Sequence, residues 1–61
     1  MAYTDLPNDP FMLLSFINMK LRDCYQNLDE LCEDLDIDRN KLILRMRASG
    51  FEYDSIQNKF W

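Results

Sequence analysis

Three helix-start signals divide most of this 61-residue chain into short segments. Asp9 precedes Pro10, Asn27 is followed three residues later by Glu30, and Asp38 opens a third apolar pattern. Asp and Asn side chains accept hydrogen bonds from the unpaired amides of a first helical turn. Pro has no backbone N–H, which costs nothing at the first helical position because an N–H there has no partner within the helix. Asn27 and Glu30 also have the spacing of a capping box. These signals predict three short helices.

Each predicted helix has one apolar face at helical spacing. We expect helices from Pro10 to about Asp23 or Cys24, from Leu28 to about Leu35, and from the Asp38 cap to about Ser49. Gly50 follows at the position where a left-handed residue ends a helix. The residues expected to face the core are Leu13, Leu14, Ile17, Leu21 and Cys24 in the first helix, Leu28, Leu31, Cys32 and Leu35 in the second, and Leu42, Ile43, Met46 and Ser49 in the third.

The alternating acidic residues between the second and third helices have two interpretations. One is a calcium loop of the EF-hand type, which needs Gly at position 6 and a bidentate Glu at position 12. A loop starting at Asp34 has Arg39 and Arg45 at those positions, and a loop starting at Asp36 has Arg47 at position 12. We therefore reject calcium and predict a turn with Ile37 as an interior hinge between two helices, which is the helix-turn-helix arrangement.

The last eleven residues change character, because aromatic residues flank a polar centre. We predict a short β-hairpin with its loop near Asp54 to Gln57, in which Phe51 opposes Phe60 and Glu52 opposes Lys59. Two strands alone are marginally stable in water, so the hairpin must pack on the helices. The natural place is an apolar strip of the first helix that lies off its core face: Met12, Phe16 and Met19.

These elements together predict a mainly α fold: a three-helix helix-turn-helix unit followed by a short C-terminal β-hairpin, similar to a miniature winged helix. We expect a single domain over residues 1–61, with an extended N-terminal segment at 1–8, the helices at 9–50 and the hairpin at 51–61.

Two stretches carry resemblances to known families. The segment LDELCEDLDIDRNKLILRMRASGF at residues 28–51 resembles the small helical module at the amino end of bacterial translation initiation factor two. Over the whole chain, DPFMLLSFINMKLRD at 9–23, LDELCEDLDID at 28–38, and the terminal Tyr53, Asp54, Asn58 and Phe60 resemble a small bacterial family catalogued as domain of unknown function 4250. This second resemblance implies a bacterial origin and a complete small protein, and it implies no activity, substrate or ligand.

Composition limits the classes of function. The chain has no His and no CxxC motif, so zinc is not expected, nor is any other metal or cofactor. Its two cysteines are expected as reduced core residues rather than as a disulfide, because the sequence shows no secretory signal. It has neither a signal peptide nor an apolar run long enough to span a bilayer, which predicts a cytoplasmic protein without a membrane partner. No nucleophile is paired with a recognisable base, so we expect no enzyme.

Two kinds of binding remain. The first is contact with a protein partner or with a second copy of the chain, because so short a chain cannot easily cover all of its large apolar residues. The residues expected to bind a partner are Met12, Phe16, Met19, Leu44 and Trp61. The alternative is weak nucleic-acid binding by the basic third helix through Arg39, Lys41, Arg45 and Arg47. The net charge of −4 disfavours this alternative. In addition, six carboxylates at residues 29–38 adjoin those cations and would repel a phosphate backbone.

Overall fold

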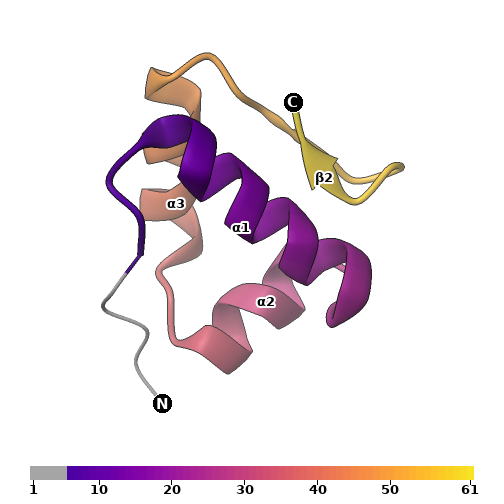
Figure 1. Cartoon of the computed structure of the whole chain (residues 1–61). Helices are drawn as coiled ribbons and strands as arrows, with labels where there is room; N and C mark the ends of the chain where they lie inside the picture. The colour runs from indigo at the N-terminus through magenta and orange to yellow at the C-terminus, as the bar shows by residue number, and fades with distance from the viewer. Residues whose placement is uncertain (1–5) are drawn as a thin grey trace.

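The computed structural model describes residues 6–61 and shows three helices followed by an antiparallel hairpin (Figure 1). The elements are α1 (Pro10–Asp23), α2 (Leu28–Leu35), α3 (Arg39–Ala48), β1 (Tyr53–Asp54) and β2 (Lys59–Phe60). The predicted fold class is therefore confirmed. Most of the predicted extended N-terminal segment, at residues 1–5, lies outside the described residues.

The predicted helix starts are capped as the sequence indicated. The Asp9 carboxylate accepts hydrogen bonds from two amides in the first turn of α1, at 2.9 and 3.1 Å. Asn27 accepts from the Glu30 amide at 2.8 Å, and Asp38 accepts from the Lys41 amide at 3.2 Å. All of these bonds join residues two or three apart in the chain, which is why local sequence predicts them.

The turn between α2 and α3 holds a hinge residue, as predicted. Asp36 adopts a left-handed conformation with φ 55°, which ends α2. The next amide, that of Ile37, donates to the Cys32 carbonyl at 2.8 Å, and the Ile37 side chain packs against the core. Within residues 6–61 no group of three or more Asp, Glu, Cys or His side chains is placed to hold a metal ion.

One core joins all three helices and the hairpin. Phe60 of β2 is completely buried in it, together with apolar side chains from each helix: Leu13, Ile17, Leu21, Leu28, Leu31, Cys32, Leu42 and Met46. Figure 1 shows α1 with the hairpin and α2 packed against it.

Two residues expected in this core are exposed. Cys24 and Ser49 are the C-terminal caps of α1 and α3, and both are solvent-accessible. Their backbone dihedrals depart from helical values, so the helical projection no longer applies to their side chains. Both cysteines are free thiols, and only Cys32 is a core residue.

The predicted hairpin register is wrong by two residues. Tyr53 opposes Phe60 and Asp54 opposes Lys59, so the loop is at residues 55–58. The physical reason is Asn58, which the predicted register places in a strand opposite Tyr53. Its left-handed conformation makes it a loop residue instead, and there it accepts a hydrogen bond from the Tyr53 hydroxyl at 2.7 Å. The same hydroxyl accepts from the Leu28 amide at 3.2 Å, so Tyr53 faces the helices.

Asn58 anchors the loop to the helices. It has a left-handed conformation with φ 54°, and its side-chain amide donates to the carbonyls of Leu21 and Tyr25, each at 3.1 Å. Phe51, which was expected to oppose Phe60, instead packs against Phe11 in an edge-to-face contact with centroids 5.8 Å apart.

The hairpin also packs on a different side of α1 from the one predicted. Asn18 donates from its amide to the Phe60 carbonyl at 2.9 Å and accepts from the Phe60 amide at 2.8 Å. It thereby satisfies both backbone groups of Phe60 as a neighbouring strand would. The hairpin therefore lies along the Asn18 side of α1 and does not cover the strip formed by Met12, Phe16 and Met19.

Candidate interaction surfaces

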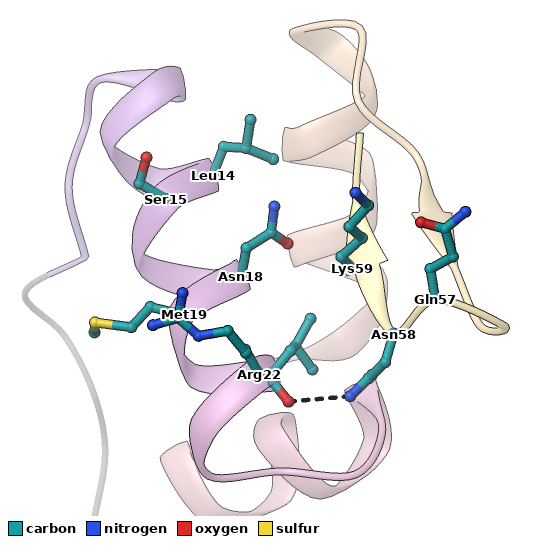
Figure 2. A pocket seen from close by; sticks show the side chains of 9 residues that line it. Leu14, Ser15, Asn18, Met19, Arg22, Gln57, Asn58 and Lys59 are labelled. Atoms are coloured by element: carbon teal, nitrogen blue, oxygen red, sulfur yellow. Dashed lines mark hydrogen bonds between the residues drawn. The ribbon is translucent and has the colours of Figure 1, made fainter.

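The side of α1 left uncovered by the hairpin carries Met12, Phe16 and Met19, which we call the α1 strip. These residues lie at i, i+4 and i+7, so they follow one line along the helix. Met12 is 63% exposed and Met19 is 43% exposed. Phe16 is partly buried against the core, and the Lys20 ammonium lies 5.8 Å from its ring centroid. Figure 2 shows the Met19 side chain pointing away from the hairpin.

The other two residues predicted to bind a partner come from different elements. Leu44 lies on α3 and is 63% exposed, and Trp61 follows β2 and is 62% exposed. The structure thus brings three of the five predicted residues onto one helix face and places the remaining two on separate elements.

Sequence analysis missed two exposed apolar residues. Phe11 lies on α1 beyond both the core face and the strip, and Ile56 stands in the hairpin loop. The signal for Ile56 was available, because it lies within the loop that the sequence predicted, and a loop gives an apolar side chain no core to enter.

A groove of about 640 Å³ runs along the junction of α1 and the hairpin (Figure 2). It is lined by Leu14, Ser15, Asn18, Met19, Leu21, Arg22, Gln57, Asn58 and Lys59. The amides of Asn18 and Asn58 hold the hairpin, as described above, and the Arg22 guanidinium makes two bonds to the adjacent Asp23 carboxylate, at 2.9 and 3.0 Å. This interaction raises the pKa of Arg22 and lowers that of Asp23. The main polar groups of the groove are thus engaged within the fold.

The predicted nucleic-acid surface is the outer side of α3, and most of its cations are already engaged. Arg39 forms an ion pair with Asp29 at 2.7 Å, and Arg47 lies 3.8 Å from Glu52. Arg45 donates to the Pro7 carbonyl at 2.6 Å. Of the four predicted cations, Lys41 alone has no hydrogen-bond or ion-pair partner for its side chain within residues 6–61.

The acidic side of the molecule is organised around Tyr25. Its hydroxyl donates to the Asp34 carboxylate at 2.5 Å, and this bond raises the pKa of Tyr25 to about 12. Both residues line an open hollow of about 660 Å³ together with Cys24, Glu30 and Glu33. The Cys32 thiol lies in the core, and its burial raises its pKa.

Comparison with known proteins identifies the family of this chain. Neither a search of curated proteins nor a search of solved structures found a significant similarity. The initiation-factor resemblance and the winged-helix likeness therefore stay predictions. Within residues 6–61 no helix is both long and apolar enough to cross a membrane. The family described as Domain of unknown function (DUF4250) matches residues 7–60, and because this match covers nearly the whole chain, the protein belongs to that family.

Proposed function

We propose that this protein is a non-catalytic interaction module that binds a protein partner, or a second copy of itself, through the α1 strip. The observation that carries the proposal is the position of the hairpin. Because Asn18 draws β2 to its own side of α1, the two methionines of the strip remain in water.

The chemistry of the strip suits protein contact. Met side chains are flexible and polarisable, and they adapt to differently shaped partners. A line of apolar residues at i, i+4 and i+7 is also the pattern by which one helix binds another helix or a groove. Three side chains offer much less area than a stable dimer buries, so the expected association is weak or transient.

The experiment compares the wild type with a double variant, Met12→Ser and Met19→Ser. Sedimentation velocity over a wide concentration range tests self-association, and affinity capture from the native host tests other partners. We expect the double variant to lose the association, because it replaces both exposed methyl thioethers by short polar groups.

Leu44→Gln is the matched control, since Leu44 is as exposed as Met12 but lies on α3. Loss of association in both variants would assign it to a larger surface that includes α3. A wild type that stays monomeric and retains no protein that the double variant loses would refute the proposal.

The non-catalytic part of the proposal rests on the sequence. With no His in the chain, the commonest general base is missing, and the four carboxylates of α2 are all exposed to solvent. The alternative of nucleic-acid binding has weaker support than protein contact, because three of the four predicted cations bond within the fold.

A further inference from the structure

The two edges of the hairpin differ in their backbone hydrogen bonding. The edge of β2 faces α1, where Asn18 satisfies both backbone groups of Phe60. The Trp61 amide donates across the hairpin to the Glu52 carbonyl at 3.0 Å. Since bonded and non-bonded pairs alternate along an antiparallel ladder, Tyr53 and Phe60 form a non-hydrogen-bonded pair.

It follows that the backbone N–H and C=O of Tyr53 point away from β2, toward the outer edge of β1. Within residues 6–61 neither group has a hydrogen-bond partner. An open edge of this kind is where an extended segment of another chain can add a strand.

The two side chains that flank Tyr53 are acidic, and each has a cation nearby. Asp54 opposes Lys59 of β2, on the side away from the outer edge, and Glu52 lies near Arg47. Tyr53 faces the helices, so its neighbours Glu52 and Asp54 lie on the outer face of the hairpin. Glu52 is exposed and lies 3.8 Å from Arg47. Asp54 accepts bonds from the amides of Gln57 and Ile56, and these bonds lower its pKa, the Gln57 bond most strongly.

Apolar groups stand next to the acidic ones. A hollow of about 410 Å³ is lined by residues 52–56 and Trp61, so it runs along β1 itself. Ile56 at its end is 94% exposed, and the exposed Trp61 ring has the Lys59 ammonium 4.6 Å from its centroid. Two carboxylates and two apolar side chains therefore line one hollow beside the unpaired backbone groups of Tyr53.

We propose that the outer edge of β1 binds an extended peptide segment of another protein as a third strand. In this segment, basic residues flank a central apolar residue. The central residue pairs with Tyr53 through its backbone. Its two neighbours lie opposite Glu52 and Asp54, and opposite charges across a strand pair are favourable.

A second copy of the chain fits this edge less well. Two β1 strands paired about Tyr53 would place Glu52 of each opposite Asp54 of the other, and like charges at opposed positions are destabilising. Charge therefore favours a basic peptide over a second copy. This edge is separate from the α1 strip, so the inference does not depend on the proposed function.

The test uses a fluorescent, end-blocked peptide, Thr-Lys-Val-Lys-Thr, and measures anisotropy with the full chain. Two matched peptides separate the contribution of charge from that of the backbone hydrogen bonds. Thr-Glu-Val-Glu-Thr reverses the charge, whereas the lysine peptide N-methylated at Val keeps the charge but removes the central N–H. We expect both to bind at least about tenfold more weakly than the lysine peptide, which corresponds to the loss of one good interaction. The amide resonance of Tyr53 should shift and gain protection from hydrogen exchange.

Protein variants supply the second arm. Glu52→Lys should remove the preference between the two charged peptides, because it leaves one cation and one carboxylate beside Tyr53. Glu33→Lys, the same charge change on the exposed side of α2, should leave the preference unchanged. The variant Met12→Ser, Met19→Ser should bind the lysine peptide as the wild type does. Equal binding of the N-methylated peptide, an equal effect of Glu33→Lys, an unmoved Tyr53 amide, or no binding at about 1 mM peptide would each overturn the proposal.

Discussion

Asn18 shows how much one side chain decides in a chain of this size. It lies on α1, and sequence analysis gave it no role. In the structure it bonds both backbone groups of a residue 42 positions away. A small domain has a free energy of unfolding of roughly 0.05 to 0.15 kcal/mol per residue. The contribution of these two hydrogen bonds is therefore a large fraction of the total.

We expect Asn18→Ala to lower the free energy of unfolding by about 2 to 4 kcal/mol, because it leaves a buried N–H and a buried C=O without partners. Urea denaturation followed by circular dichroism measures this change. Ser15→Ala, on an exposed position of the same helix, is the matched control and should have little effect. Equal stability of the Asn18→Ala variant and the control would mean that water replaces the two hydrogen bonds of Asn18 to Phe60.

Tyr25 makes stability depend on pH in the alkaline range. Its pKa is about 12 in the folded chain, above the ordinary value of 10.0 for a tyrosine hydroxyl, so the folded state holds the proton more tightly than the unfolded chain does. This contribution to stability is complete below about pH 10 and is lost as the pH rises toward 12.

The measurement is an ultraviolet titration of the tyrosine hydroxyls alongside denaturation at each pH. Asp34→Asn removes the carboxylate that accepts the Tyr25 proton, so the Tyr25 pKa should fall back toward its usual value. An unchanged titration curve in this variant would show that the Tyr25–Asp34 bond does not form in solution.

At the scale of elements, α3 combines a basic sequence with internal pairing. Four cations and no carboxylate at residues 39–47 suggested a surface for phosphate. The structure directs two of them to carboxylates of α2 and the hairpin, and a third to the N-terminal segment. Few charges remain to displace counterions, and the carboxylates of α2 stand close by.

We therefore expect no retardation of mixed DNA and RNA by the wild type, even at about 50 mM salt, where electrostatic binding is strong. If retardation occurs, Lys41→Glu with Arg45→Glu should abolish it while the helical circular dichroism stays unchanged. Retardation that this double variant loses would establish the nucleic-acid alternative.

For the whole molecule, the shared core predicts a single cooperative unit. Phe60 of the hairpin is buried among side chains of all three helices, and the Tyr53 hydroxyl bonds the first amide of α2. Neither the helices nor the hairpin can bury this apolar surface alone, and a two-stranded hairpin is marginal by itself.

We expect denaturation followed by helical circular dichroism and by the fluorescence of Trp61, at the end of the hairpin, to give the same midpoint. The midpoint should also be unaffected by reducing agents, because Cys24 and Cys32 are free thiols. An earlier transition of Trp61 would show that the hairpin separates from the helices before they unfold.

The sequence by itself determined the three helices and their starts, the turn at Ile37 and the presence of a C-terminal hairpin. These features depend on bonds within a few residues or on apolar periodicity, and both can be read from neighbouring positions. It also identified Met12 and Met19 as apolar residues off the core face of α1.

Only the tertiary structure decided the hairpin register, the side of α1 that the hairpin covers, and the exposure of Met12 and Met19. Asn18 with Phe60 and Tyr53 with Leu28 are pairs distant in the chain, and an Asn side chain most often faces water. Their partners are backbone groups, which every residue carries alike, so no pattern of side chains could indicate which ones they would bond.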